Sequence, residues 1–281
     1  MKNFFIISKS NRETNKKYIG LVKDYIESHG GTCIVGNNEC LASTETDIVV
    51  PEDTECIISI GGDGTVVRVA HNISNSRVPL VGLNCGHLGY LCDMSVDNYR
   101  ECLDILLSTN CRFEDRLMLE GGLKSAPQET FKALNDVVVN STTAGTYVLN
   151  LSVSVNGIHL YSHNCDGLIL ATPTGSTAYN LSANGPIVSP HADCIVLTPI
   201  NPHTLNSRSI ILSAEDTIDI QVGVRNKNYE PEAGVIFDGV PKAILRGGDT
   251  LEIYKSSHTT RMVRLESINF IERIRARMQE I

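Results

Sequence analysis

The chain has 281 residues, of which 42% are hydrophobic and 20% are charged, with 22 glycines and 10 prolines. These proportions are typical of a globular protein and exclude a disordered, collagenous or low-complexity chain. No apolar stretch approaches the length of a transmembrane helix, and the apolar run at the N-terminus is too short for a signal peptide. At about 150 residues per domain, the length favours two domains.

The net charge is -8, from 24 basic and 32 acidic residues. This balance argues against a protein that coats nucleic acid or an anionic membrane, so neither is expected as a partner. The nine cysteines are dispersed and form no Cys-x-x-Cys pair, which is typical of reduced thiols in a cytoplasmic protein.

The first third of the chain alternates strand-like and helix-like segments. Strands are predicted at Phe4–Ser8, Cys33–Val35, Cys56–Ile60 and Val78–Leu83, and helices at Asn15–Ser28, Thr65–Ile73 and Val96–Leu107. Strands that alternate with helices indicate βαβ units on a parallel sheet.

After about residue 112 the pattern changes to short strands of alternating polarity. The clearest case is a hairpin, in which Asn156-Gly157 joins the run Leu149–Val155 to the run Ile158–Tyr161. This spacing predicts a mostly antiparallel β domain. Further strands are predicted at Phe131–Val139, Gly167–Ala171, Cys194–Thr198, Ser209–Ser213, Thr217–Val222, Gly234–Phe237, Thr250–Tyr254 and Arg261–Leu265.

The last segment is again helical, with an apolar stripe formed by Phe270, Ile271, Ile274 and Met278. We expect the helix to return to the N-terminal α/β domain and its stripe to join the core, because a lone amphipathic helix after a β domain must pack on another element. The predicted domains are an α/β nucleotide-binding domain over residues 1–112 plus 266–281 and a β-rich domain over residues 113–265.

A first chemical motif lies in a segment that is typical of strand, glycine turn and helix, where Gly61, Gly62 and Gly64 surround Asp63. Glycines let a ligand approach the main chain, and consecutive amides at a helix N-terminus suit a phosphate. A carboxylate beside a phosphate repels it, so Asp63 either caps the helix that starts near Thr65 or accepts a proton from an attacking hydroxyl. We favour the proton acceptor, because a cap needs no surrounding glycines.

The glycine pattern also excludes two common phosphate-binding loops. No G-x-x-x-x-G-K-[ST] occurs anywhere in the chain, so a P-loop is excluded. Val67 stands where the third glycine of a G-x-G-x-x-G fingerprint belongs, so the dinucleotide-binding fingerprint is incomplete.

A second and more specific motif spans Asp166–Pro186, where an apolar strand ends in a glycine turn rich in hydroxyl groups. A hydroxyl both donates and accepts hydrogen bonds, which suits a ribose and the edge of a base. Tyr179 could add an aromatic wall. The hydroxyl-bearing residues are Thr172, Thr174, Ser176, Thr177, Tyr179 and Ser182.

These motifs resemble those of the NAD kinase family. The matching segments are Gly61–Thr65, Asn84–Leu91, Leu134–Val137 and Asp166–Pro186, in the order and spacing of that family. The Gly-Gly-Asp-Gly-Thr turn is shared with lipid kinases and loosely with phosphofructokinases, whereas the Thr-Pro-Thr-Gly-Ser-Thr-Ala-Tyr run is far more specific. The resemblance is good over Ile57–Leu212 and poor over residues 1–50.

The resemblance implies an enzyme that transfers the γ-phosphate of ATP, or a phosphate of polyphosphate, to the 2′-hydroxyl of the adenosine ribose of NAD. It implies Asp63 as general base, Mg²⁺ or another divalent cation with ATP, and a homodimer or homotetramer. The β-rich domain would then be NAD-binding. The residues implied in binding are Gly61, Gly62, Gly64, Thr65, Arg68, Tyr90, Asn135, Asp136, Asn164, Asp166, Thr174, Thr177, Ala178, Tyr179, Asn180 and Ser182.

Within that set, the resemblance assigns Asn135 and Asp136 to the adenosine side of NAD and Asp166 to the nicotinamide side, often across a subunit boundary. Asp136 is shorter than the glutamate of many members, and Asn164 stands where many carry arginine. No metal-binding residues are predicted, because the histidines fit no zinc spacing and no Cys pair joins them.

Two other classes stay open on the sequence. A lipid kinase would use the same Gly-Gly-Asp-Gly turn, although the chain lacks an apolar or basic segment for membrane docking. A non-catalytic dinucleotide sensor would gain nothing from a carboxylate beside phosphate, so the intact Asp63 argues against it.

Overall fold

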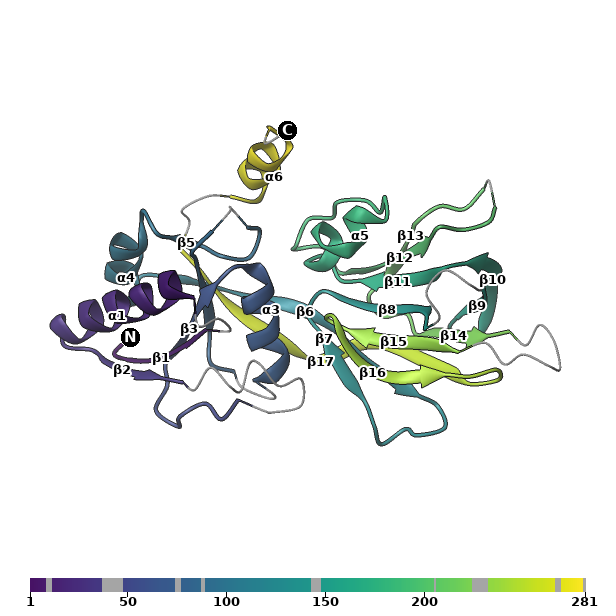
Figure 1. Ribbon diagram of the computed structural model, residues 1–281, viewed down its shortest axis with the longest axis horizontal. Helices are drawn as coiled ribbons and strands as arrows, with labels where there is room; N and C mark the ends of the chain where they lie inside the picture. The colour runs from purple at the N-terminus through teal and green to yellow at the C-terminus, as the bar shows by residue number, and fades with distance from the viewer. Residues whose placement is uncertain are drawn as a thin grey trace. The chain divides into compact units, whose positions relative to one another are not determined.

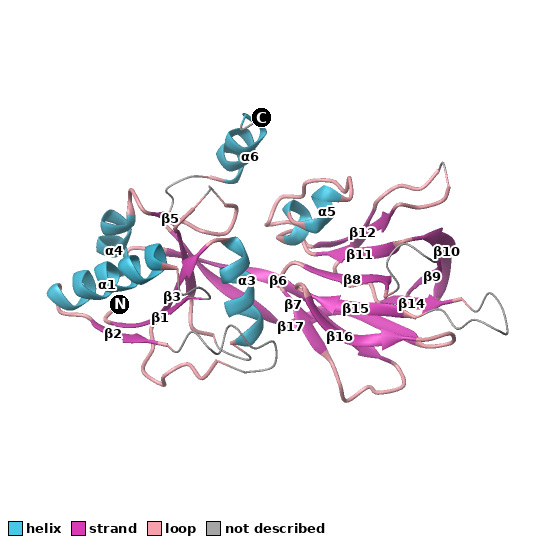
Figure 2. Cartoon of the chain, viewed as in Figure 1, coloured by secondary structure: helices cyan, strands magenta, loops and turns pink. Residues whose placement is uncertain are grey.

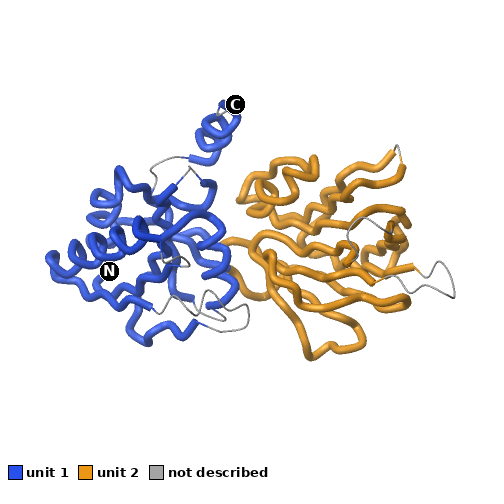
Figure 3. Tube along the Cα trace, in the orientation of Figure 1, with its two compact units in different colours: residues 1–115, 260–281 blue, residues 116–259 orange. Residues whose placement is uncertain are grey.

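The computed structural model describes residues 1–8, 12–36, 48–73, 77–86, 89–142, 148–204, 206–223, 232–265 and 269–279. The chain divides into two compact units, which Figure 3 draws in different colours. Unit 1 comprises Met1–Asp115 and Thr260–Ile281, and unit 2 comprises Arg116–Thr259.

Unit 1 contains a parallel sheet with helices packed against it (Figure 1). Its inner strands are buried apolar runs, which is typical of a sheet covered on both faces, whereas the edge strand Thr32–Val35 is mostly exposed. The strand order is β2 (Thr32–Val35), β1 (Asn3–Ser8), β3 (Cys56–Gly61) and β4 (Leu80–Asn84), with β5 (Met94–Ser95) beside the end of β4. The helices are α1 (Glu13–Ser28), α3 (Asp63–Asn72) and α4 (Tyr99–Leu107).

The carboxyl ends of β3 and β4 lie side by side in unit 1. Gly61 at the end of β3 is in register with Asn84 at the end of β4, and the amide of Cys85 donates to the carbonyl of Gly61 at 3.0 Å. Ligands of open parallel sheets bind outside these carboxyl ends. The parallel pairing therefore brings the glycine turn that begins at Gly61 beside the start of the matching segment Asn84–Leu91.

Unit 2 consists of two antiparallel sheets (Figure 2). One has the order β13 (Ile210–Ser213), β12 (Cys194–Ile200), β11 (Gly167–Ala171), β8 (Asp136–Ser141), β15 (Ala233–Phe237) and β16 (Val240–Leu245). The other contains β10 (Ile158–Cys165), β9 (Leu149–Val155), β14 (Ile218–Val222) and β7 (Phe131–Ala133), together with most of β17 (Thr250–Arg264) and of β6 (Arg112–Leu123). The remaining ends of β17 and β6 belong to unit 1, where Met262 of β17 pairs with Leu80 of β4. Alternate apolar residues of both sheets, such as Leu151 and Leu170, form one buried cluster.

The predicted α/β domain followed by an antiparallel β domain is confirmed, with differences in detail. The predicted strand Phe131–Val139 is two strands, β7 and β8, interrupted at Leu134 and Asn135. The two strands predicted at the C-terminal end are one strand, β17, because its polar middle has no glycine or proline to break it.

Three strands were not predicted, namely β6, β16 and the two-residue β5. Gly121 suggests a break in β6, but it lies within the strand. Glycine is needed there because β6 and β17 approach closely, and a Cβ at Gly121 would lie 2.1 Å from the carbonyl oxygen of Glu252. β16 carries Pro241, which is tolerated because β16 is an edge strand.

The C-terminal helix α6 (Phe270–Gln279) belongs to unit 1, but its packing is not the predicted one. The apolar stripe is largely exposed, with Ile271 at 70% and Met278 at 66% of full exposure. The residue that α6 buries is Arg273, at 1%. The prediction that the stripe joins the core is therefore wrong, and polar contacts of Arg273 hold the helix instead.

Two negative findings apply to the described part of the chain. No helix there has the length and apolar character needed to cross a bilayer. The eight cysteines it contains are all free thiols.

Candidate functional site

Asp63 is the first residue of α3, and its carboxylate is held by the turn that follows β4. Oδ2 accepts the amide N–H of Tyr90 at 2.6 Å, and Oδ1 accepts those of Leu91 at 3.1 Å and Cys92 at 3.3 Å. The N-cap of α3 is Gly62, and no side chain caps the helix. The alternative that Asp63 caps its own helix is therefore wrong, because its acceptor oxygens bind amides of a different segment.

The turn closes tightly over this carboxylate. A Cβ atom at Gly89 would lie 2.1 Å from Oδ1 of Asp63, so only glycine allows the approach. The thiol of Cys92 also lies against Asp63, and its pKa is raised by burial and then by the negative charge of that carboxylate. The thiol is therefore neutral at physiological pH and adds no negative charge beside Asp63.

The three predicted glycines of the first motif differ in what they allow. A Cβ atom at Gly61 would lie 2.2 Å from Oγ1 of Thr65, so Gly61 makes room for the buried Thr65 side chain. At Gly62 and Gly64 a Cβ would meet nothing within 4 Å. These two glycines leave open space above the first turn of α3, where amides lack intrahelical acceptors and the helix dipole favours an anion.

Arg68 lies one helical turn after Gly64 and therefore on the same face of α3. Its guanidinium is partly buried, and Nη1 has no hydrogen-bond partner among the described residues. A buried donor without an acceptor is unfavourable by about 1–3 kcal/mol. An anionic ligand at this face would supply the missing acceptor.

Unit 2 places the predicted Asn135 and Asp136 at the interruption between β7 and β8, where Asp238 fixes the main chain. The carboxylate of Asp238 accepts the amides of Leu134 at 2.7 Å, Asn135 at 2.8 Å and Asp136 at 3.2 Å. The sequence analysis assigned no role to Asp238. The available signal was the Asp238-Gly239 turn, in which both residues have positive φ, at 48° and 77°.

The side chains of Asn135 and Asp136 place polar groups in buried surroundings at this interruption. Oδ1 of Asn135 is buried and has no hydrogen-bond partner among the described residues. Burial and, after it, the neighbouring charge of Asp238 together raise the pKa of Asp136 to about 7. Both side chains are suited to bind a polar ligand that reaches this interruption.

The turn after β11 packs directly on the same interruption. Oγ1 of Thr172 donates to the carbonyl of Leu134 at 2.6 Å and accepts the amide of Gly175 at 3.0 Å. A Cβ at Gly175 would lie 2.0 Å from the carbonyl oxygen of Asn135. The third and fourth matching motifs, far apart in sequence, therefore meet in unit 2.

The polar groups of this turn fall into two sets. Ser176 and Asn180 are fully buried, and Asn180 donates to the carbonyls of Ser176 and Pro186, both at 3.0 Å, and accepts from Thr198 at 2.7 Å. Their bonds stabilise the turn itself. Tyr179 is 45% exposed at the start of α5 (Tyr179–Ser182) and is open to a ligand.

The remaining predicted residues around this turn also have distinct positions. Thr174 is buried, and its Oγ1 accepts from Nη1 of the buried Arg116 at 3.3 Å. Thr177 and Ala178 are half-buried, and Ser182 is exposed. Of the predicted residues in this turn and in α5, those open to a ligand run from Thr177 to Tyr179, together with Ser182.

Asp166 and Asn164 lie away from this group. Asp166 precedes β11 and Thr172 follows it, so the two lie at opposite ends of that strand, roughly 20 Å apart at about 3.4 Å per residue. Asp166 is exposed and accepts from Nδ2 of Asn201 at 3.0 Å, and Asn164 accepts from Nδ2 of Asn150 at 2.9 Å. Within one chain, Asp166 does not join the turn that carries Tyr179.

No cluster of three or more His, Cys, Asp or Glu side chains suited to a metal ion occurs in the ranges that the structure describes.

Known proteins match this chain in both of its units. The family model for the ATP-NAD kinase N-terminal domain matches residues 8–110, and that for the ATP-NAD kinase C-terminal domain matches residues 134–265. The NAD kinase of Agathobacter rectalis is 38% identical over 281 residues, and that of Lachnoclostridium phytofermentans is 36% identical over 283 residues. Both alignments cover 99% of this chain and 99% of the relative.

Two solved structures share the fold at 23% identity. Yeast NADH kinase complexed with NADH has a TM-score of 0.87, with 100% of this chain and 88% of that chain covered. An NAD kinase from Archaeoglobus fulgidus in complex with ATP has a TM-score of 0.77, with 98% of this chain and 96% of that chain covered.

Proposed function

The chain belongs to the NAD kinase family, and we propose that it transfers the γ-phosphate of ATP, or a phosphate of polyphosphate, to the 2′-hydroxyl of the adenosine ribose of NAD, giving NADP. Membership of this family of enzymes sets aside the lipid kinase and the non-catalytic sensor. The observation that carries the proposal is the carboxylate of Asp63, fixed by three amides beside the open first turn of α3.

In the proposed reaction, Asp63 is the general base of unit 1. The 2′-oxygen of the ribose attacks the γ-phosphorus, the bond from that phosphorus to the bridging oxygen of ADP breaks, and the hydroxyl proton moves to Asp63. Phosphoryl transfer passes through a loose transition state, so positioning and charge neutralisation contribute most of the rate. The amides at Gly62 and Gly64 and the guanidinium of Arg68 would bind the phosphate oxygens.

The phosphate donor is proposed to enter as its complex with Mg²⁺ or another divalent cation. Bound in this way, the cation neutralises charge on the transferred phosphate. Gly61 and Thr65 shape the turn, and the amide of Tyr90 orients the base.

Unit 2 is proposed to recognise NAD. Asn135 and Asp136 would bind the adenosine side, since the first has a buried oxygen without a partner among the described residues and the second has a buried carboxyl group with a raised pKa. Thr177, Ala178, Tyr179 and Ser182 would contact the ribose and adenine. The buried Asn180 and Thr174 would act by holding this turn in place.

Asp166 and Asn164 are proposed to contact the nicotinamide side of an NAD molecule bound to another subunit of a homodimer or homotetramer. Their position at the far end of β11 supports this assignment, because one chain does not bring them to the turn at Tyr179. We also propose a cytoplasmic location, in keeping with the free thiols of the described cysteines.

The test is a coupled assay in which the protein is incubated with NAD, Mg²⁺ and either ATP or polyphosphate, and NADP is measured with an NADP-specific dehydrogenase. We expect Asp63→Asn to keep the fold and the affinity for NAD and to lower kcat by about 10²–10⁴-fold, the usual contribution of a general base. The matched control is Asp53→Asn, an exposed carboxylate of unit 1. Wild-type turnover in a folded Asp63→Asn protein would remove Asp63 from its proposed role.

A further inference from the structure

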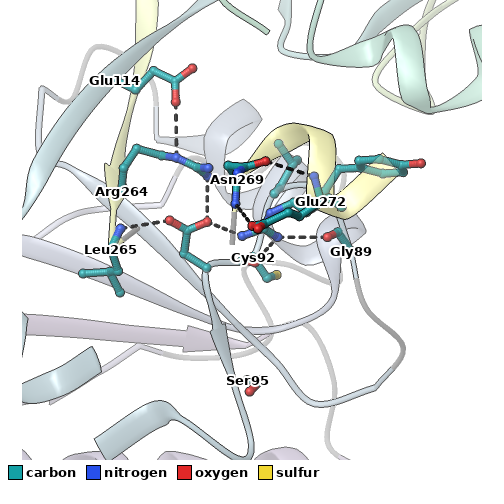
Figure 4. Close-up of polar contacts among 12 residues, drawn as sticks. Gly89, Cys92, Ser95, Glu114, Arg264, Leu265, Asn269 and Glu272 are labelled. Carbon is teal, nitrogen blue, oxygen red and sulfur yellow. Dashed lines mark hydrogen bonds and ion pairs between the residues drawn. The ribbon is translucent and has the colours of Figure 1, made fainter. Parts of the chain in front are cut away.

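A buried arginine connects the C-terminal helix to the turn that holds Asp63. α6 begins with a reciprocal cap, in which the amide of Asn269 donates to Glu272 at 3.0 Å and the amide of Glu272 donates to Asn269 at 2.9 Å (Figure 4). This cap fixes the first turn of the helix. Arg273 lies in that turn and is almost completely buried.

The guanidinium of Arg273 binds the main chain of the turn at both of its ends. Nη1 donates to the carbonyl of Gly89 at 3.0 Å and to that of Cys92 at 2.6 Å. The amides of Tyr90, Leu91 and Cys92 between and at these points are the ones that hold Asp63. One short segment thus accepts from Arg273 through its carbonyls and donates to Asp63 through its amides.

Neutralising Asp93 does not explain why Arg273 is buried. Nη2 of Arg273 contacts Oδ1 of Asp93 at 2.6 Å, but Nη1 of Arg264 contacts the same oxygen at 2.6 Å, and the amide of Leu265 binds Oδ2 at 3.0 Å. Asp93 therefore has a cationic partner without Arg273. Burying a second guanidinium is unfavourable unless it makes further hydrogen bonds, and the two carbonyl contacts are those bonds.

We propose that Arg273 is a positioning residue for phosphoryl transfer: it holds the Gly89–Cys92 turn in the conformation whose amides orient Asp63. The inference deepens the proposed function, since it takes Asp63 as the base. Arginine suits this role because its planar guanidinium presents several donors in a fixed geometry, so one group can reach two carbonyls and a carboxylate together. A lysine at the same position keeps a charge for Asp93 but has no such fixed fork.

The direct test compares Arg273→Lys and Arg273→Met with Arg275→Met, an exposed arginine on the same helix. We expect Arg273→Lys to fold and to lower kcat roughly 10- to 100-fold, because a misplacement of about 1 Å can lower a rate by about 10². The KM values for NAD and ATP should stay within about twofold of wild type, and Arg275→Met should have wild-type kinetics. If Arg273→Met does not fold, the comparison of Arg273→Lys with Arg275→Met alone decides the test.

Two further measurements distinguish positioning from general stabilisation. First, amide hydrogen exchange at Tyr90–Cys92 should be faster in Arg273→Lys, while exchange in the buried strand β3 stays at the wild-type rate. Second, Arg273→Lys should lower the residual turnover of an Asp63→Asn protein by less than twofold, because Arg273 acts through that carboxylate.

Several outcomes overturn the inference. A folded Arg273→Lys with wild-type kcat, unchanged exchange at Tyr90–Cys92, or an equal loss in the wild-type and Asp63→Asn backgrounds would each do so. Wild-type turnover in Asp63→Asn would overturn the general base itself and this inference with it. By contrast, an inactive Asp63→Asn beside a fully active Arg273→Lys would leave the proposed function standing and remove only the role of Arg273.

Discussion

The protonation of Asp136 gives a prediction about stability that can be tested without substrate. Burial, followed by the charge of Asp238, raises the pKa of Asp136 from its ordinary 3.8 to about 7 in the folded protein. Between these two values the folded state keeps a proton that the unfolded state releases. The free energy of unfolding therefore falls as the pH rises toward 7, and this contribution is fully lost above that value.

The size of the effect follows from the same two pKa values. A tenfold change in proton affinity corresponds to about 1.4 kcal/mol, so the whole contribution is at most about 4 kcal/mol. About 2–3 kcal/mol of it lies between pH 5 and pH 8, because Asp136 is protonated in the folded protein through most of the lower part of that range.

The perturbation is Asp136→Asn, which keeps the shape of the side chain and removes its charge. Urea unfolding at several pH values should show this variant gaining stability relative to wild type from about pH 5 to about pH 8. The exposed Asp53→Asn serves as the control for a change of one surface carboxylate. A difference between Asp136→Asn and wild type that is the same at both ends of the range would refute the reasoning.

Two glycine substitutions test the close approaches in each unit. Gly89→Ala should push the Asp63 carboxylate aside, because the new Cβ would lie 2.1 Å from Oδ1, and we expect kcat to fall roughly 10²-fold in a folded protein. The control is Gly20→Ala in α1, where a Cβ meets nothing within 4 Å; equal kinetics in the two variants would contradict the prediction. Gly175→Ala should lower the free energy of unfolding by about 1–3 kcal/mol, because its Cβ would lie 2.0 Å from the main-chain oxygen of Asn135. If Gly175→Ala has the melting temperature of the wild type, this prediction is wrong and the turn has adjusted to the new Cβ.

Sequence patterns located the motifs where the structure is determined locally. β11 matches its predicted bounds, Gly167–Ala171, because an unbroken apolar run between a polar residue and a proline turn has few alternatives. The strand, glycine turn and helix around Asp63 were predicted for the same reason. In both cases the decisive residues lie within a few positions of one another.

The parts that could not be predicted depend on contacts between distant residues. Asp238 binds the amide of Leu134 across 104 positions, and Arg273 binds the carbonyl of Gly89 across 184 positions. No local pattern marks such a pair. The cap formed by Asn269 and Glu272 could have been recognised from its spacing, but it predicts where α6 begins and not which face of the helix is buried.

Hydroxyl-rich sequence is ambiguous for a related reason. The side chain of Ser176 bonds the main chain of Pro173 and Val188, and it does so with the same groups that would bind a ribose. A single sequence does not separate the two uses, because they need the same donors and acceptors. The fold separates them, since Ser176 is fully buried and Tyr179 is 45% exposed.

Each unit contains a carboxylate that accepts three main-chain amides, but the carboxylate has a different role in each unit. Asp238 is an anchor, because its oxygens hold the amides of Leu134, Asn135 and Asp136 in place. Asp63 is anchored, because a turn fixed by Arg273 presents three amides to it. In each case the main chain is ordered during folding, before a ligand arrives, so its ordering does not weaken ligand binding. A base that is already oriented needs less reorganisation at the moment of reaction, which is why a single methyl group at Gly89 is expected to affect turnover more than folding.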